Sequence, residues 1–307
     1  MAGVEAALVL DAHFRRASAP PGELADAFHG LHVPIHHNRH IAAAAERADR
    51  DEVRRAGRWL VRNGVDRCSV TVGLALVAAV ATTDDIPLIQ TIGLLSRRFG
   101  PLAAHALERL PGRTEALLWL ADRVTGWGRV HVVEALCRLD DPAARPWLLR
   151  RACDDDYLNR YFAGTVAVAA GLHEAVRDLA SDHEFIEHTG RLLLMMSDCE
   201  GTGATLAHYP HSAMVWEAHS GQVRLLSPSV EGFVTLAMLA QFLTTASPEA
   251  AGCTAEQRRA LRAAYVSLLD REDWADAARA GLAARDRRMR WLVDFRAPEL
   301  RLRALPG

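Results

Sequence analysis

Five histidines near the start of the chain form the densest group of side chains capable of chemistry. His29, His32, His36, His37 and His40 lie within the segment FHGLHVPIHHNRH. Neutral imidazole is a good ligand for zinc and other transition metals, and His36 and His40 share a face if the segment after residue 34 is helical. No Cys or carboxylate lies beside these histidines. Two interpretations stay open: a metal site, and a loop or partner-contacting surface whose charge changes near the ordinary imidazole pKa of about 6.5.

A second histidine group, HEFIEH at residues 183–188, only partly matches a metalloprotease helix. Such a helix needs two His four positions apart, with a Glu beside the first. The residue four positions after His183 is Glu187, so the zinc pattern fails. The sequence instead predicts an exposed helical turn with i,i+4 pairs, His183 with Glu187 and Glu184 with His188.

Composition excludes several enzyme classes. All 36 basic residues are Arg, which removes Schiff-base enzymes, phosphate-loop nucleotidases and protein kinases, because each needs a Lys. Gly201 and Gly203 begin like a dinucleotide fingerprint, but Leu206 occupies the position of its third glycine, and no Gly-x-Ser-x-Gly string occurs. The sequence therefore predicts no cofactor and no catalytic residue.

Cysteine usage and hydropathy predict a cytoplasmic protein. The five cysteines are odd in number, widely spaced and never arranged as Cys-x-x-Cys, which favours buried thiols in a reducing compartment. The N-terminus lacks the basic start of a secretion signal. The longest apolar stretch, residues 70–81, is shorter than the roughly 20 residues that a membrane span requires.

Charge is unevenly distributed along a chain whose formal net charge is −2. Residues 1–150 carry 19 Arg and 17 acidic residues, residues 151–256 carry 5 and 14, and residues 257–307 carry 12 and 7. An acidic centre repels phosphate, so a nucleic-acid surface would be confined to the flanks. Nucleic acid is therefore an unlikely partner, although the sequence does not exclude it.

The elements that position these side chains are predicted to be helices almost throughout. Ala, Leu, Arg and Glu dominate, and apolar residues recur three and four positions apart. Residues 83–112, 113–139 and 140–171 each read as a helix, a turn and a second helix. Phe99-Gly100 and Trp127-Gly128 are expected just before the second helices, which end in the related strings ALERL and ALCRL. Single helix pairs cannot bury their apolar faces alone, so such units must stack.

With its Asp141-Pro142 opening and Ala/Leu-rich second helices, the chain resembles the HEAT-like family of α-helical repeats over about residues 51–180. The resemblance implies an all-α fold, a curved α-solenoid of stacked antiparallel helix pairs, with a more irregular helical part toward the C-terminus. One continuous domain over residues 1–307 is expected, with a soft division near residue 200 into a repeat array and a C-terminal segment. HEAT-like arrays mostly serve as scaffolds.

The repeats carry the polar group predicted to bind a partner. Solenoids bind along the concave face formed by one helix of each pair, where aromatic faces, guanidinium groups and carboxylates suit a protein or peptide ligand. The candidate residues are Trp119, Asp122, Arg123, Trp127, Arg129, Arg151, Asp155, Tyr157, Arg160 and Tyr161. The alternative is that the Trp residues fill space between repeats and the charged residues form a solvated helix surface.

The sequence thus predicts a non-enzymatic protein-binding scaffold, with a DNA glycosylase as the alternative. HEAT-like alkylpurine DNA glycosylases hold a damaged base in a concave groove with Trp, a catalytic Asp and phosphate-contacting Arg. The resemblance implies Trp119 and Asp122 in those roles, with Arg123 or Arg129 contacting phosphate. The Arg-rich stretch 279–303 is expected to cap the array, the alternatives being a membrane surface, RNA or an acidic partner.

Overall fold

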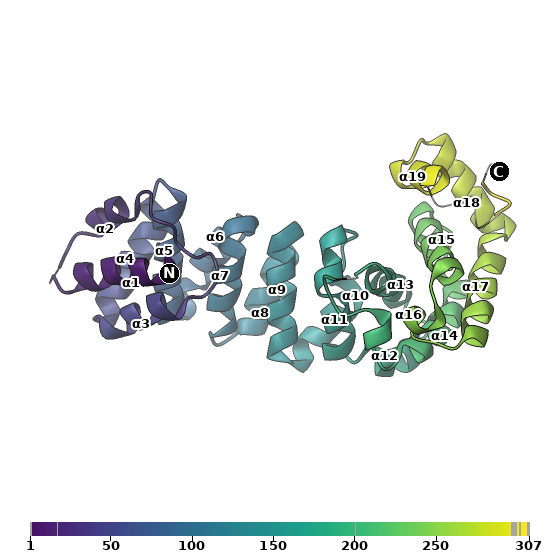
Figure 1. Cartoon of the computed structure of the whole chain (residues 1–307), viewed down its shortest axis with the longest axis horizontal. Helices are drawn as coiled ribbons and strands as arrows, with labels where there is room; N and C mark the ends of the chain where they lie inside the picture. Colours follow the sequence, from purple (N-terminus) through teal and green to yellow (C-terminus); the bar gives the residue numbers. More distant parts are fainter. Residues whose placement is uncertain (1, 17, 200, 296–299, 301, 306–307) are drawn as a thin grey trace. The chain divides into compact units, whose positions relative to one another are not determined.

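The computed structural model describes residues 2–16, 18–199, 201–295, 300 and 302–305. These residues form 19 α-helices and five short 3-10 helices and contain no strand, which confirms the all-α prediction (Figure 1). The chain divides into two compact units, residues 1–141 (unit 1) and residues 142–307 (unit 2). The expected single domain and its soft division near residue 200 stay predictions.

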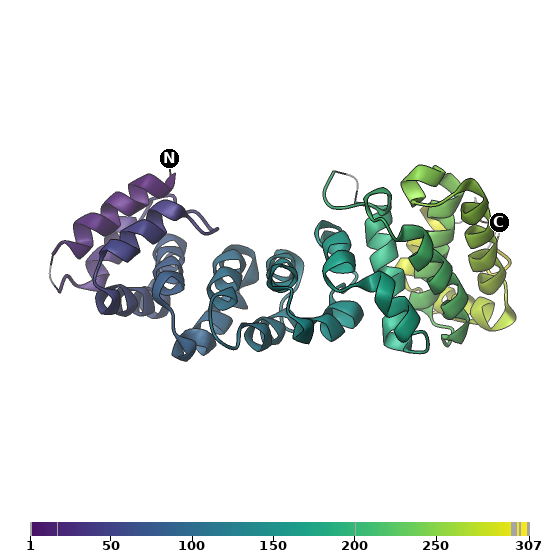
Figure 2. The same ribbon diagram turned by 90° about the horizontal axis from the view of Figure 1, so that it is seen from below.

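Unit 1 consists of helix pairs stacked in chain order. Its described α-helices are α1 (Ala2–Phe14), α2 (Pro21–Phe28), α3 (Arg39–Arg47), α4 (Arg50–Asn63), α5 (Arg67–Val80), α6 (Ile86–Gly93), α7 (Ser96–Glu108), α8 (Arg113–Ala121) and α9 (Gly126–Leu139). The odd-numbered helices form one row, in which α1 packs on α3, α3 on α5, α5 on α7 and α7 on α9. Among the even-numbered helices, α2 packs on α4 and α6 packs on α8. Figures 1 and 2 show these pairs side by side, from purple to blue.

Short polar residues fix where the helices of unit 1 begin. The side chains of Asn38, Asp49 and Asp66 accept hydrogen bonds from the first backbone N–H groups of α3, α4 and α5. Asp85, which precedes α6, is only 1% exposed and accepts a 2.6 Å hydrogen bond from Arg58 Nε on α4. Burial alone would raise the pKa of Asp85, but hydrogen bonds from Arg58 and from the N–H of residue 82 hold it below its ordinary value.

The first two predicted repeats coincide with α6–α7 and α8–α9, but the predicted turn positions were wrong. Gly100 lies inside α7 and Gly128 in the first turn of α9, rather than before these helices. A Cβ on Gly100 would lie 3.4 Å from the Cα of Gly128. The two glycines therefore lie where the backbones of α7 and α9 approach each other, and they serve helix packing rather than a turn.

Unit 2 begins with three helices of seven residues each, and most of its helices after residue 182 are longer. Its described α-helices are α10 (Arg145–Arg151), α11 (Ala163–Ala169), α12 (Leu172–Asp178), α13 (His183–Ser197), α14 (Ser212–Gln222), α15 (Val230–Thr245), α16 (Pro248–Ala251), α17 (Ala255–Leu269), α18 (Glu272–Ala283) and α19 (Arg287–Phe295). The 3-10 helix η3 (Tyr157–Tyr161) lies between α10 and α11. The third predicted repeat contains the two short helices α10 and α11, which contact each other, together with two 3-10 helices, η2 (Pro142–Ala144) before α10 and η3 before α11.

Helices α13 and α15 are central to unit 2. Helix α13 packs against α10, α11, α14 and α15, and α15 also packs against α17, α18 and α19 (Figure 1). Trp216, Tyr265 and Trp274 are fully buried between these helices. Trp216 Nε1 donates to the carbonyl oxygen of Ala251 at 3.1 Å, so this large side chain is buried with its polar atom satisfied.

The HEFIEH segment forms the start of α13, and one of its predicted surface pairs was wrong. His188 is fully buried, and its Nε2 accepts a 2.9 Å hydrogen bond from the backbone N–H of Cys153. Glu184 instead pairs with Arg151 at 2.8 Å. The i,i+4 spacing correctly predicted a helix here. His188 does not pair with Glu184, because its ring accepts the hydrogen bond that the buried N–H of Cys153 needs.

Candidate functional site

The predicted partner-binding residues fall in both units. Those of unit 1 differ in the neighbours that they contact. The guanidinium of Arg123 lies 4.2 Å from the centre of the Trp119 ring and donates to the Trp119 carbonyl oxygen at 2.8 Å. Trp127 stacks on His131, with ring centres 6.1 Å apart. Arg129 is 8% exposed and donates to the carbonyl oxygen of Ala121 at 2.9 Å, so it holds the turn between α8 and α9.

Three of the five candidates in unit 2 lie together at a groove. Asp155, Tyr157 and Arg160 line a cavity of about 630 Å³. Arg151 is outside this set and pairs with Glu184 on α13, as described above. Tyr161 is half-buried and does not line the cavity. The segment around η3 is therefore the part of the predicted surface that borders a concave site.

The groove is formed by α13, α15, α19, η3 and the residue Asp155 that leads into η3. Side chains of α13 and α15 supply an apolar lining, whereas charged side chains lie around it. The lining residues are Asp155, Tyr157, Arg160, Leu194, Met195, Ser197, Asp198, Glu231, Val234, Thr235, Met238, Gln241, Phe242, Thr245, Arg287, Arg288 and Trp291. Val234, Met238 and Phe242 follow one another at four-residue steps, so they form one ridge along α15.

Two aromatic side chains at the groove are unusually exposed. Tyr157 is 62% exposed and Trp291 is 42% exposed. The guanidinium of Arg160 lies 5.3 Å from the centre of the Tyr157 ring, and its Nε donates to the Tyr157 carbonyl oxygen at 2.8 Å. Large aromatic side chains that reach solvent beside an apolar groove are typical of surfaces that bind other molecules.

Ion pairs join the charged residues around the groove. Arg288 Nη1 on α19 lies 3.2 Å from Asp155 Oδ2, and Arg160 Nη2 lies 3.1 Å from Asp198 Oδ2. The backbone of Asp155 has a φ of 67°, in the left-handed region. These pairs connect α19 to the segment before η3 and connect η3 to the end of α13.

The groove combines an apolar lining with charged side chains. Its apolar lining comes from Leu, Met, Val and Phe side chains, and its carboxylates and guanidinium groups lie on the rim. Across the described parts of the chain, no group of three or more His, Cys, Asp or Glu side chains is placed to hold a metal ion. The side chains that line the groove can bury an apolar surface of a ligand and make charge contacts at the edges of that surface.

Sequence reasoning missed most of the groove. Met195, Met238 and Phe242 were missed because apolar residues four apart on a helix are the ordinary signature of a core face. Trp291 and Arg287 were part of the predicted array cap and were not assigned to a site. The sequence does show a Trp within an Arg-rich helix. These side chains reach the groove only because α19 packs on α15, and that contact cannot be predicted from the local sequence.

The histidine cluster has partners that come from distant parts of the chain. The rings of His37 and His105 have centres 4.3 Å apart, and those of His36 and His131 are 5.4 Å apart. His105 belongs to α7 and His131 to α9, so the segment before α3 contacts two helices of the stack. The residues His29 to His40 therefore do not gather around one point.

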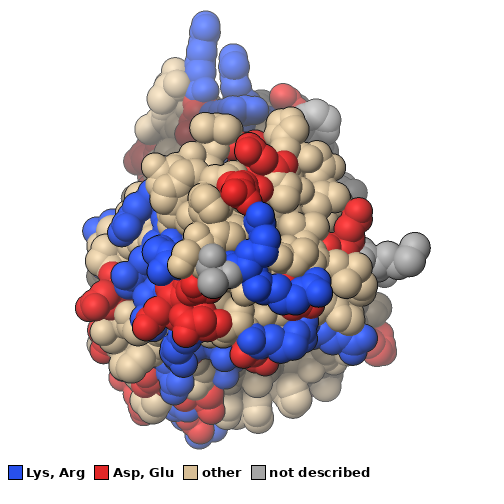
Figure 3. Space-filling model, turned by 90° about the vertical axis from the view of Figure 1, so that its left-hand side faces the viewer, with Lys and Arg blue, Asp and Glu red and all other residues tan. Residues whose placement is uncertain are grey.

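Charge is mixed on the end of unit 1 that Figure 3 views, where Arg and acidic side chains lie among one another. On the N-terminal helices, Arg47 pairs with Asp11 at 2.8 Å. Arg55 pairs with Glu52 at 3.5 Å. Such a surface lacks the extended basic face that nonspecific binding to a phosphate backbone needs.

Comparison with known protein families, with curated proteins and with solved structures finds no match. The HEAT-like resemblance therefore stays a prediction from the residues of this chain. None of the described helices combines the length and the apolar character that crossing a bilayer requires.

Proposed function

We propose that the chain is a non-enzymatic, HEAT-like scaffold that binds a segment of another protein in the groove of unit 2. One observation carries the proposal: a cavity of about 630 Å³ with an apolar lining, bordered by the exposed rings of Tyr157 and Trp291. The stacked helix pairs of unit 1 support the repeat architecture. A cavity of several hundred Å³ accommodates a few anchoring side chains of a ligand.

The occupant that fits best is an amphipathic helix from the partner. Val234, Met238 and Phe242 form a ridge along α15, and Leu194 and Met195 on α13 form the facing wall. A groove between two helices accepts the apolar face of a third, with anchors at i, i+3, i+4 and i+7. Methionine side chains adapt to different anchors, which suits a surface that receives a partner side chain.

The charged rim defines the polar edges of that partner. Arg287 and Arg288 lie on the α19 side, whereas Asp198 and Glu231 lie at the end of α13 and the start of α15. Asp198 and Glu231 are already paired within the chain, with Arg160 and Arg191, so a partner helix with charges of both signs at the edges of its apolar face would exchange these pairs for contacts of its own. Such rim charges set orientation and association rate more than affinity.

Selection from a displayed library of amphipathic helices tests this proposal. We expect the full chain to select peptides with Leu, Met or Phe on one face and charges of both signs at its edges. Trp291→Ala and Met238→Asp should each weaken binding of the selected peptides about tenfold or more, as loss of a central anchor does. Trp119→Ala, which changes an exposed Trp of unit 1, is the matched control.

Two outcomes would contradict the proposal. The selected peptides would bind Met238→Asp as tightly as the unchanged protein, or Trp119→Ala would weaken binding as much as Trp291→Ala. Thermal unfolding of each variant separates a lost anchor from a lost fold, because Trp291 and Trp119 are both partly solvent-exposed. A native partner should then contain a segment of the selected type and compete with the peptide for the groove.

A further inference from the structure

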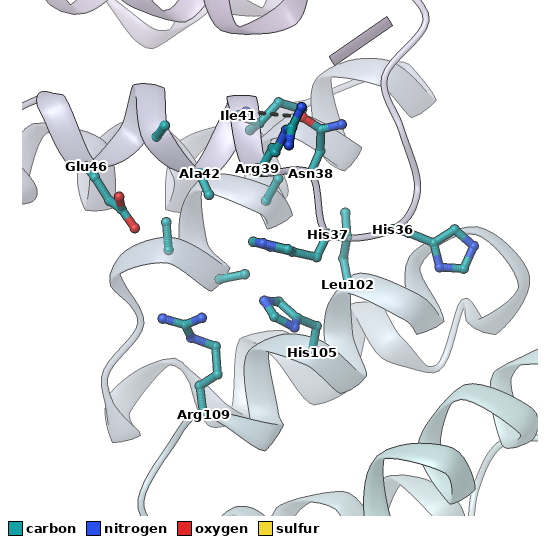
Figure 4. Close-up of a pocket in the computed structure, with 14 residues that line it drawn as sticks. His36, His37, Asn38, Arg39, Ile41, Ala42, Glu46, Leu102, His105 and Arg109 are labelled. Atoms are coloured by element: carbon teal, nitrogen blue, oxygen red, sulfur yellow. Dashed lines mark hydrogen bonds between the residues drawn. The ribbon is translucent and has the colours of Figure 1, made fainter. Parts of the chain in front are cut away.

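A smaller pocket lies in unit 1, where the segment before α3 approaches α7. Its volume is about 250 Å³. Alanines of α3 and α5 form much of its wall (Figure 4). Its polar lining is His36, His37, Asn38, Arg39, Glu46, His105 and Arg109. An apolar cavity of roughly 150 Å³ accommodates benzene, so this pocket has room for a compound somewhat larger than a single ring.

Two imidazoles meet in the pocket. The ring centres of His37 and His105 are 4.3 Å apart, and the rings are inclined by 33° (Figure 4). Burial lowers the pKa of His105 to about 4, and the positive charges of His37 and Arg109 act in the same direction. His105 is therefore neutral at pH 7, and a neutral imidazole has one ring N–H that donates to an acceptor.

Unneutralised charges face the same space. Figure 4 shows the Arg109 and Glu46 side chains reaching toward the pocket from opposite walls. Within the described part of the chain, neither side chain has an ion-pair partner within 4 Å. Glu108, the neighbour of Arg109 on α7, forms two 3.0 Å hydrogen bonds with Arg138 instead. Arg109 consequently keeps its charge available at the pocket, unlike Arg138.

We propose that this pocket binds a small molecule through an oxyanion, a carboxylate or a phosphate. Arg109 supplies the opposite charge, and His37 and His105 donate hydrogen bonds to the anion. The alanine wall receives the apolar part of the ligand. Glu46 disfavours anions of high charge and accepts a hydrogen bond from an N–H group of the ligand. This site is separate from the groove, and its proposal does not depend on the proposed scaffold function.

The chemistry of the lining favours an anion over a metal ion. Three histidines line the pocket, but Figure 4 shows the His36 ring turned away from those of His37 and His105, and His36 pairs with His131 on α9. Across the described residues, no three His, Cys, Asp or Glu side chains are placed to hold a metal ion. A zinc site usually has at least three protein ligands. Arginine beside the two rings also opposes a cation and favours an oxyanion.

The test is titration of the full chain with inorganic phosphate and, separately, with acetate. Imidazole signals of His37 and His105 are followed by NMR at constant ionic strength, with chloride as the reference salt. We expect saturable shifts of both rings and a rise in the pKa of His105, because a bound anion favours its protonated form. The stronger of the two responses identifies phosphate or carboxylate as the recognised group.

Three charge variants give the expected pattern. Arg109→Gln should weaken phosphate binding about tenfold, since a charge-assisted contact is lost. Glu46→Gln should strengthen it, because a negative wall charge is removed. Arg62→Gln removes the same charge from an exposed position of α4 outside the pocket and should leave binding unchanged. His105→Gln is a second test of the imidazole contact, and thermal unfolding confirms that each variant is folded.

Three results would overturn the proposal. Chloride would reproduce the phosphate-induced shifts, Arg62→Gln would weaken binding as much as Arg109→Gln, or neither anion would give a saturable response. Stoichiometric zinc binding that anions do not compete with would assign the two histidines to a metal instead.

Discussion

Asp155 links the backbone of the groove to its charges. Its φ of 67° lies in the left-handed region, and its carboxylate pairs with Arg288 across the groove. Asp and Asn tolerate this region better than other residues with a Cβ, because their short polar side chains bond locally. The backbone conformation at position 155 therefore favours a short polar side chain. The ion pair with Arg288 additionally requires that this side chain be negatively charged.

Two substitutions separate these requirements. Asp155→Asn should lower the free energy of unfolding by at most about 1 kcal/mol, because it removes a partly exposed ion pair and keeps the tolerated conformation. Asp155→Ala should cost about 1 kcal/mol more, since the left-handed region is strained for Ala. Denaturant titration measures both, and equal losses would show that the backbone conformation at this position carries no strain.

Two half-buried histidines of unit 1, His105 and His131, make stability depend on pH. Burial, together with the charge of His36, lowers the pKa of His131 to about 4, and His105 has a similar value. In the unfolded chain both have a pKa of about 6.5. Below pH 6.5 the unfolded state takes up protons that the folded state does not, so the free energy of unfolding falls as the pH decreases toward 4.

This dependence is checked with His131→Gln. The unchanged protein should lose up to about 1 kcal/mol per pH unit for each such histidine between pH 6 and 5, less any solvent screening. The variant should show a shallower slope over that interval, measured as the thermal midpoint against pH. His183→Gln changes an exposed histidine of α13 and is the control. Identical slopes in all three proteins would contradict the lowered pKa of His131.

The sequence predicted which single residues could bind a ligand or a partner. It did not predict which residues lie next to one another in the fold. The sequence marked His36 and His37 as unusual, yet their partners His105 and His131 lie on α7 and α9, and nothing local connects them. Tyr157 and Arg160 were predicted as binding residues because aromatic and guanidinium groups suit that role. Arg129 had the same character, but its guanidinium is used by backbone carbonyl groups inside unit 1.

At the scale of elements, glycine decides how closely α4 and α5 pack. A Cβ on Gly57 would lie 3.0 Å from the backbone N of Val77, and one on Gly73 would lie 2.6 Å from the Cβ of Leu60. Both contacts are with the facing helix, and neither is with the end of a flexible side chain. The two glycines therefore allow a helix crossing that any larger residue would widen.

Gly73→Ala should accordingly destabilise unit 1. We expect a loss of about 1–3 kcal/mol in the free energy of unfolding, the usual cost of overpacking. Gly221→Ala is the matched comparison, because a Cβ at that position of α14 meets nothing within 4 Å. It should stabilise by about 0.5–1 kcal/mol through helix propensity. A Gly73→Ala variant as stable as the unchanged protein would mean that α4 and α5 can separate without cost.

Helix periodicity predicted most elements of the repeats, and a local hydrogen bond altered the third one. The predicted helix pair over residues 83–112 contains α6 and α7, and the pair over 113–139 contains α8 and α9. Residues 140–171 also satisfied the repeat pattern, but three consecutive acidic residues precede η3 there. Asp156 accepts a hydrogen bond from the N–H of Leu158, which favours a 3-10 turn at this point.

At the scale of the whole molecule, each unit has buried apolar residues of its own. A cluster that includes Leu10, Phe28 and Leu60 lies within unit 1. Trp216, Phe233 and Trp274 are fully buried in unit 2. Chains of 140 to 170 residues are long enough to bury a stable core. The sequence predicts one continuous domain with a soft division near residue 200, whereas the contacts of the described structure group residues 1–141 and 142–307. Which residues share a core depends on such contacts, and local chain breaks do not report them.

Two ways of cutting the chain distinguish these divisions. Fragments 1–141 and 142–307 should each fold with a cooperative thermal transition, because the cut falls between the two compact units. Fragments 1–200 and 201–307 should differ, since that cut separates α13 from α14 and α15, on which it packs. Fragment 201–307 would then expose the apolar side of α15 and should unfold without cooperativity or aggregate. Circular dichroism and calorimetry measure the helix content and the cooperativity of unfolding of each fragment. If fragment 201–307 unfolded cooperatively while fragment 1–141 was unfolded, the domain boundary would lie near residue 200 instead.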